Sequence, residues 1–173
     1  TVNNLRERTT HYFRVGSLNW NNAANYVNAG STKTLIQLPA GCLTGFIVKQ
    51  AGGEDFTTIQ GAVNALPAPL TGPTCIVIND GATYSEQVTV RNIDNGVAGS
   101  SLTILADPAL GLQPVVNPPQ GSTAAFQVAN SSVNLFGLSV ISTNSVPYGV
   151  WASSAYVRIS TVNIIDPGGM ITS

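Results

Sequence analysis

Apolar residues recur at a fixed spacing along residues 126–164, and this repeat constrains the fold more than any other feature of the sequence. When residues 126–140 are aligned with residues 150–164, an offset of 24, six positions suited to a protein interior coincide. Small or polar residues stand between them, as in half-buried strands. The aligned pairs are Phe126 with Val150, Val128 with Ala152, Val133 with Val157, Leu135 with Ile159, Leu138 with Val162, and Val140 with Ile164.

Earlier segments continue the repeat less regularly. A spacing in the twenties with short strands in each turn is typical of a parallel β-helix, in which every coil stacks its inward residues on the previous coil. The sequence therefore predicts an all-β domain over residues 41–173, with about four coils. The earlier alignments are Ile76 and Ile78 with Leu102 and Ile104 at an offset of 26, Leu102 and Ile104 with Val133 and Leu135 at 31, and Val88 and Val90 about one turn before Val115.

Residues 55–67 depart from the strand pattern. Their apolar positions follow a helical spacing, Thr57 and Gln60 suit a capping box, and Pro67 suits the end of a helix. The first coil of a solenoid needs a cover, because it otherwise exposes unpaired backbone and apolar surface. We therefore predict that residues 55–67 form a helix that caps the N-terminal end of the β-helix.

Acidic residues concentrate around this cap. Glu54 and Asp55 precede the predicted helix, where negative charge favours the positive end of its dipole. Asp80 and Glu86 flank a tight turn, and two carboxylates can ligate calcium or act as a catalytic pair. Two carboxylates are few for a calcium site, so we expect Asp80 to serve the turn and Glu86 to hold a structural position.

The C-terminal end has no comparable cap. The last predicted coil ends at Ile165 and is followed by a short tail to Ser173. The cover for this coil must be further coils, another subunit, or the tail itself.

Residues 1–40 form a separate N-terminal arm in this interpretation. A strand is predicted over residues 10–15, a turn over residues 16–22 and a second strand over residues 32–38. Two strands alone are not stable in water. The arm must therefore pack on the β-helix, on another domain or on a neighbouring chain.

Composition excludes several classes of partner. Only 9% of the residues are charged, the net charge is −1, and no cluster of Lys and Arg provides the footprint of a nucleic-acid-binding protein. No apolar run reaches the roughly 18–20 residues of a membrane span. A surface rich in Ser, Thr and Asn but poor in charge predicts an extracellular or cell-surface location.

The chain contains two cysteines and one histidine. Cys42 and Cys75 are too few for a zinc cluster, and they form either one disulfide or two buried free thiols. His11 has no Ser or Cys nucleophile motif near it, so it is expected to be an exposed face residue. The sequence predicts no catalytic, metal or cofactor site.

Aromatic residues on the last coils raise the question of sugar binding. Tyr148, Trp151 and Tyr156 either pack in the fold or form a platform for sugar rings. Trp151 falls between Val150 and Ala152, so its side chain is expected to point outward.

The segment over residues 55–67, followed by residues 76–78 and 81–90, resembles the start of pectin-lyase-like right-handed β-helix proteins, above all pectin methylesterases. Their opening reads F-x-T-I-Q-x-A, a strand, and G-x-Y-x-E-x-V, and the resemblance implies a right-handed β-helix. In the esterases two aspartates and an arginine of later coils line the active site. Asp107, Arg158 and Asp166, the charged residues of 96–173, lie in no segment that resembles those motifs, so no catalytic residue carries over. The matching residues are Phe56, Thr58, Ile59, Gln60, Ala62, Tyr84, Glu86 and Val88, with one extra residue after Gly81.

Residues 9–36 resemble the last two strands of a fibronectin type III-like domain, whose penultimate strand reads Y-x-F-R-V-x-A-x-N. Phe13, Arg14, Val15 and Asn19 carry the match, Ser17 replaces the small residue, and His11 replaces the tyrosine. The resemblance implies that the arm is a remnant of such a domain in a modular surface protein.

Three functions follow from these observations. The first is a non-catalytic structural or adhesive module, in its stronger form a filament subunit in which the arm or the cap of one chain covers the open coil of the next. The second is a fragment of a carbohydrate-active enzyme of the pectin esterase or lyase type. The third is a carbohydrate-binding module that uses Trp151 and Tyr148. We favour the first, with self-association through the β-helix ends and the arm, and with polysaccharide as a further candidate partner.

Overall fold

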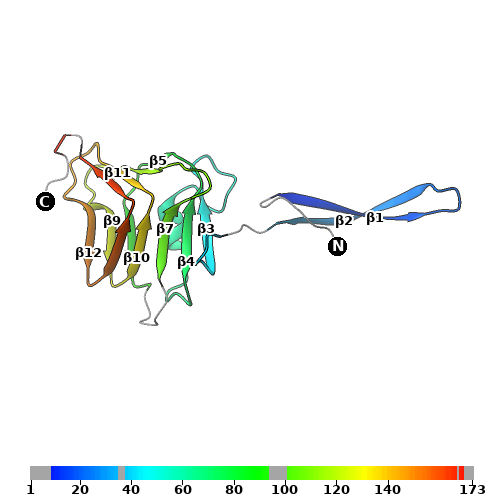
Figure 1. Cartoon of the computed structure of the whole chain (residues 1–173), viewed down its shortest axis with the longest axis horizontal. Helices are drawn as coiled ribbons and strands as arrows, with labels where there is room; N and C mark the ends of the chain where they lie inside the picture. Colours follow the sequence, from blue (N-terminus) through cyan, green and yellow to red (C-terminus); the bar gives the residue numbers. More distant parts are fainter. Residues whose placement is uncertain (1–8, 35–37, 94–100, 167, 170–173) are drawn as a thin grey trace. The chain divides into compact units, whose positions relative to one another are not determined.

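The computed structural model describes residues 9–34, 38–93, 101–166 and 168–169 (Figure 1). The chain divides into two compact units, residues 1–37 and residues 38–173. The larger unit is a parallel β-solenoid of about four turns, as the repeat predicts. We call the smaller unit the arm unit.

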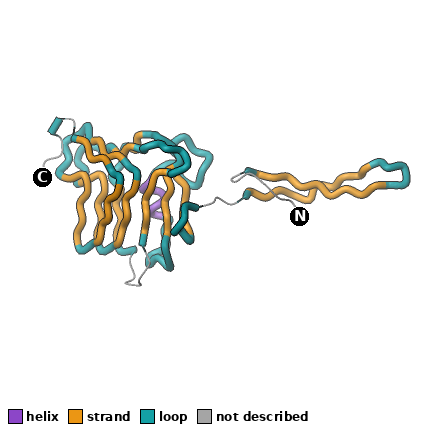
Figure 2. The backbone as a smooth tube through the Cα atoms, viewed as in Figure 1, coloured by secondary structure: helices purple, strands orange, loops and turns teal. Residues whose placement is uncertain are grey.

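Three parallel sheets form the walls of the solenoid (Figures 1 and 2). Each complete coil passes through sheet 1, sheet 2 and sheet 3 in turn. Sheet 1 contains β3 (Thr44–Val48), β4 (Thr74–Ile78), β7 (Leu102–Ala106), β10 (Ser132–Phe136) and β13 (Tyr156–Ser160). Sheet 2 contains β5 (Thr83–Tyr84), β8 (Val115–Val116), β11 (Ser139–Ile141) and β14 (Asn163–Ile165). Sheet 3 contains β6 (Val88–Arg91), β9 (Ala124–Ala129) and β12 (Tyr148–Ser153).

The strand register confirms the repeat in the later coils. The pairs are in register across β9 and β12, β10 and β13, and β11 and β14 at the predicted offset of 24. Leu102 and Ile104 likewise pair with Val133 and Leu135 at the predicted offset of 31.

The predicted register of the first coil is wrong. Ile76 pairs with Ile104, an offset of 28 rather than 26, and Val88 pairs with Phe126 rather than standing one turn before Val115. Val115 itself pairs with Thr83. For Ile76 the error is a slip of two residues, which leaves every side chain on the same face of the strand, so the apolar pattern does not distinguish the two registers. Val88 and Val115 lie in different sheets, sheet 3 and sheet 2.

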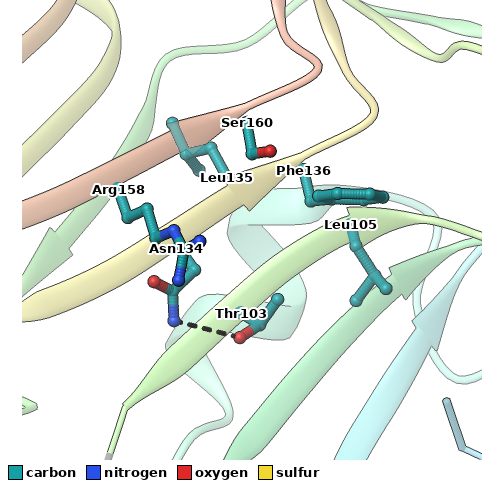
Figure 3. A pocket seen from close by; sticks show the side chains of 7 residues that line it. All are labelled: Thr103, Leu105, Asn134, Leu135, Phe136, Arg158 and Ser160. Atoms are coloured by element: carbon teal, nitrogen blue, oxygen red, sulfur yellow. Dashed lines mark hydrogen bonds between the residues drawn. The ribbon is translucent and has the colours of Figure 1, made fainter. Parts of the chain in front are cut away.

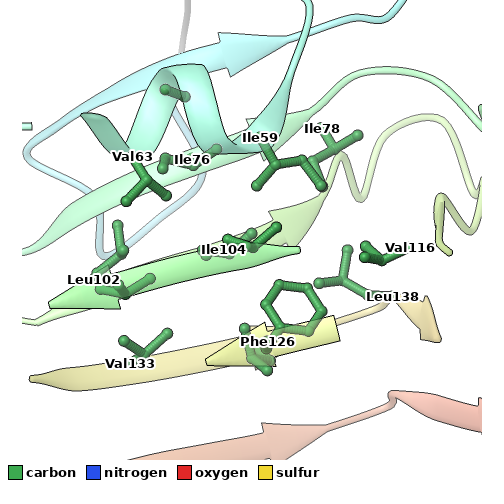
Figure 4. Close-up of a cluster of buried hydrophobic side chains, with 14 of the residues drawn as sticks. Ile59, Val63, Ile76, Ile78, Leu102, Ile104, Val116, Phe126, Val133 and Leu138 are labelled. Carbon is green, nitrogen blue, oxygen red and sulfur yellow. The ribbon is translucent and has the colours of Figure 1, made fainter. Parts of the chain in front are cut away.

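Stacked apolar side chains fill the interior (Figure 4). Ile76, Ile104 and Leu135 come from successive coils of sheet 1 and are almost completely buried, and Phe126 fills the space opposite them. Complete burial of such a side chain contributes about 1.5–3 kcal/mol. The solenoid therefore has one continuous core.

Single residues with positive φ form the corner between sheet 3 and sheet 1. Asn92, Asn130 and Ser154 each follow the last residue of a sheet 3 strand and have φ between 47° and 56°. Asparagine adopts this left-handed conformation more readily than most residues do. Asn130 Nδ2 donates to Asn92 Oδ1 at 3.0 Å, so the first two corners also stack through their side chains.

The N-terminal end of the solenoid is covered, as predicted, by a helix, but this helix is shorter than residues 55–67. Helix α1 (Ile59–Asn64) buries Ile59, Ala62 and Val63 against the first coil (Figure 4). Phe56 remains extended because its backbone bridges Val48. Among the described residues no helix is long and apolar enough to cross a bilayer.

The predicted capping box of Thr57 and Gln60 is wrong, and the N-cap lies one residue later. Thr58, not Thr57, is the N-cap, and its hydroxyl accepts from the Gly61 amide at 3.1 Å. Gly61 has no side chain to complete a capping box. Gln60 instead holds the helix to β6, because its Oε1 accepts from the Thr89 amide and its Nε2 donates to the Thr89 carbonyl.

The arm unit contains an antiparallel hairpin of β1 (Thr10–Leu18) and β2 (Ala24–Lys33). The second strand lies earlier than the predicted residues 32–38, of which residues 35–37 fall outside the described part of the chain. The sequence does not predict β2 well because it contains Asn25, Asn28 and Gly30, and these residue types are depleted in strands. The turn follows Leu18, and Asn19 Oδ1 accepts from the amides of residues 21 and 23 within it.

Candidate functional site

The outer face of sheet 1 carries a groove of about 350 Å³ over its last three strands (Figure 3). Thr103, Asn134 and Arg158 are register partners on β7, β10 and β13, so they form one polar row. Asn134 Nδ2 donates to Thr103 Oγ1 at 3.3 Å. The neighbouring row places Phe136 between Leu105 and Ser160, which gives the groove an apolar side.

This groove was not predicted from the sequence. Thr103, Asn134 and Arg158 are separated by 31 and 24 residues, the same offsets that relate the inward residues of these strands. The repeat therefore predicts that these outward residues lie in one row. The row offers a cation, an amide and one hydroxyl group, and Ser160 in the neighbouring row adds a second hydroxyl. These groups can bind a polar ligand, but they include no nucleophile with an adjacent base, which bond cleavage by covalent catalysis needs.

Asp80 has the turn role that the sequence predicts. Its Oδ1 accepts from the Ala82 amide at 3.3 Å and from the Tyr84 hydroxyl at 2.8 Å, and its Oδ2 accepts from the Gln50 amide at 2.8 Å. Burial and the hydrogen bond to Asp80 raise the pKa of Tyr84 well above its ordinary value. Both oxygens of Asp80 are therefore used to fix the turn.

Glu86 brings negative charge to the start of α1 from the first coil. Its two carboxylate oxygens accept from the amides of Ile59 and Gln60, each at 2.8 Å. Asp55 Oδ2 accepts from the Ile47 amide at 2.9 Å. The sequence predicts a favourable charge at this helix end from Glu54 and Asp55, and the fold adds Glu86.

We expect Glu86→Gln to destabilise the solenoid by about 1–3 kcal/mol, because a neutral amide keeps one acceptor and loses the charge assistance at both amides. Urea unfolding followed by circular dichroism measures the change. A loss below about 0.5 kcal/mol would show that water replaces the carboxylate at no cost to the cap.

The described residues contain no group of three or more His, Cys, Asp and Glu side chains placed to hold a metal ion. His11 was predicted to be an exposed face residue, but it is half-buried on β1 opposite Thr32.

Trp151 and Tyr148 do not form a shared platform. Val150 and Ala152 stack on the core residues Phe126 and Val128, whereas Trp151 pairs with Gln127 on the outer face. Trp151 therefore points outward, as predicted. Tyr148 is three residues away on the same strand, and residues with an odd separation lie on opposite faces.

The C-terminal coil is uncovered in the described part of the chain. Leu135 and Val140 on the third coil are 1% and 0% exposed, but their register partners Ile159 and Ile164 are 46% and 47% exposed. We call the surface formed by β13 and β14 the open coil. Ile159 and Ile164 are apolar and occupy inward positions like core residues, but no further coil covers them in the described part of the chain.

Cys42 and Cys75 form a disulfide with their Cα atoms 5.7 Å apart. The bond ties the segment before β3 to β4. Gly45 is the register partner of Cys75, and a Cβ at Gly45 would overlap the Cys75 carbonyl oxygen, so β3 approaches β4 more closely than any other residue type allows.

Comparisons of this chain with protein-family models, curated proteins and solved structures find no match. Family membership therefore assigns no functional residue to it.

Proposed function

We propose that this protein is a non-catalytic structural module that associates with other copies of itself through the open coil. The observation that carries the proposal is the exposure of Ile159 and Ile164, whose partners one coil earlier are fully buried. An apolar strand edge of this kind is a template for association. The function is geometric, because a stack of rigid coils extends or anchors a larger assembly.

We place the module outside the cell or on its surface. Disulfides persist in oxidising compartments, and Cys42 and Cys75 form one. The low content of charged residues, 9%, agrees with a structural wall rather than a catalytic surface.

The resemblance to pectin-lyase-like proteins has a physical basis in this proposal. Gln60 and Glu86, two residues of the shared pattern, join α1 to the first coil. Their role is to close the solenoid, so the pattern favours the fold without favouring esterase or lyase activity. The likeness of the arm to a fibronectin type III-like strand pair supports a modular surface protein.

Polysaccharide binding is a secondary proposal. The outward Trp151 lies beside Gln127, which accepts from Arg91 Nη2 at 3.0 Å and from Gln87 Nε2 at 3.1 Å. An aromatic ring beside ordered polar groups suits a sugar ring, although Tyr148 lies on the other face.

Oligomeric state tests the main proposal. We expect the native chain to form oligomers in light scattering and linear particles in electron microscopy, and Ile159→Lys/Ile164→Lys to remain monomeric, because two charges cannot be buried in an apolar contact. Leu110→Lys/Leu112→Lys is the matched control, since these residues are 45% and 47% exposed but lie in the loop after β7. A native chain that stays monomeric at every concentration would contradict the proposal, as would loss of assembly in the control.

A further inference from the structure

We infer that the open coil of one copy binds the β1–β2 hairpin of a second copy, so that copies associate head to tail. This inference rests on the proposed self-association through the open coil and identifies the surface that meets it. Two other surfaces compete for this role, the capped end of a second solenoid and a second open coil.

The capped end is unsuited to the role. β3 extends sheet 1 beyond β4, and α1 covers the first coil with Ile59 and Ala62 fully buried. The end of a second solenoid therefore presents a finished cap rather than an exposed apolar layer.

The hairpin exposes an apolar surface that can cover the open coil. Val15 and Val27 are register partners on one face of the hairpin and are 66% and 68% exposed. Tyr26 lies over Gly16 on the opposite face, since its ring stands where a Cβ of Gly16 would be. A two-stranded ribbon cannot bury either face by itself, so the Val15–Val27 pair needs an external apolar surface.

The capped end also shows how an added strand completes this solenoid. β3 pairs in parallel with β4 at one end of sheet 1, and β13 is the last strand at the other end. Strand addition to such an edge is a common mode of recognition, in which backbone hydrogen bonds add to apolar contacts. The hairpin supplies preformed strands of nine and ten residues, longer than the five residues of β13.

Net charge distinguishes the hairpin from a second open coil as the partner. The arm unit has a net charge of +3, and residues 38–173, with three basic and seven acidic residues, have a net charge of −4. Association of an arm unit with a solenoid is therefore attractive at long range, whereas two solenoids repel each other. The charged residues of the arm unit are Arg6, Arg8, Arg14 and Lys33 against Glu7.

Mixing two full-length variants tests the inference. Val15→Ser/Val27→Ser removes the apolar pair of the hairpin and leaves the open coil intact, while Ile159→Lys/Ile164→Lys does the reverse. We expect each variant to be monomeric alone and the mixture to form a one-to-one complex, because each variant supplies the surface that the other lacks. Tyr12→Ser/Leu18→Ser changes exposed residues on the other face of β1 and is expected to assemble like the native chain.

A second hairpin variant guards against a folding defect. Val15→Thr/Val27→Thr keeps the β-branched shape that strands favour, and we expect its apparent Kd for self-association to rise at least about tenfold, which is 1.4 kcal/mol. Far-ultraviolet circular dichroism checks that both hairpin variants keep the native strand content.

Two results would overturn the inference. If Val15→Ser/Val27→Ser assembles normally while Ile159→Lys/Ile164→Lys does not, open coils bind each other, and only the proposed function survives. Salt provides the same distinction, since head-to-tail association should weaken as ionic strength rises and association of two negatively charged solenoids should strengthen. Absence of a complex in the mixture of the two monomeric variants would also refute the hairpin as the partner.

Discussion

Phe126→Ala is expected to lower the free energy of unfolding of the solenoid by about 3–5 kcal/mol. Phe126 is fully buried on β9, and its register partners are Val88 on the preceding coil and Val150 on the following one. Removal of the ring opens a cavity between three coils, and the stacked strands limit how far the walls can close. Because coils in a solenoid are stabilised mainly by their neighbours, we expect the damage to reach both interfaces.

Urea unfolding measured by circular dichroism provides the comparison, with Phe136→Ala as the control. Phe136 lies on the outer face of sheet 1 and is 43% exposed, so its removal should cost no more than about 1.5 kcal/mol. Equal losses in the two variants would contradict the assignment of Phe126 to a tightly packed interior.

Loss of the disulfide is expected to reduce stability by about 3–4 kcal/mol, the chain-entropy value for a loop of this length. Cys42 and Cys75 are separated by 33 positions, and their bond joins the segment before β3 to the first complete coil. Cys42→Ala/Cys75→Ala removes the bond without burying a hydroxyl in place of the buried Cys75. We expect thermal unfolding of this variant to be insensitive to a reducing agent.

The native chain under reducing conditions is the companion measurement, and its melting temperature should fall to that of the double alanine variant. A loss smaller than about 1 kcal/mol in both experiments would mean that the strand pairing of β3 holds the segment in place without the covalent bond.

The repeat revealed the solenoid because inward residues are selected for the interior on every coil. It gave the correct register between β10 and β13 at an offset of 24 and between β7 and β10 at an offset of 31. For the first coil the pattern left a two-residue ambiguity, and Ile76 was assigned to the wrong partner. Periodicity reports which face a residue occupies, and it does not report how far a strand has slipped along its neighbour.

Contacts between distant segments were less accessible to prediction. Glu86 accepts from the amides of Ile59 and Gln60, which lie 27 and 26 residues earlier in the chain, and no local sequence pattern predicts this contact. β2 was missed in part because its Asn and Gly residues are uncommon in strands, and pairing with β1 outweighs that preference. The groove at Arg158 is lined mainly by outward residues of sheet 1, whereas the apolar repeat concerns the inward residues.

The short corners have a consequence for the length of the molecule. The third coil begins at Ser132, and the chain returns to the register-equivalent position at Tyr156 after 24 residues. Its corners at Gly137 and Ser154 are formed by residues with positive φ, so they require no long loop. A duplication of residues 132–155 would join to itself with the same corners and lengthen the rod by about 4.8 Å, the spacing between neighbouring strands. Rods of graded length are therefore accessible from this sequence by tandem duplication of one segment, with the cap and the last coil unchanged.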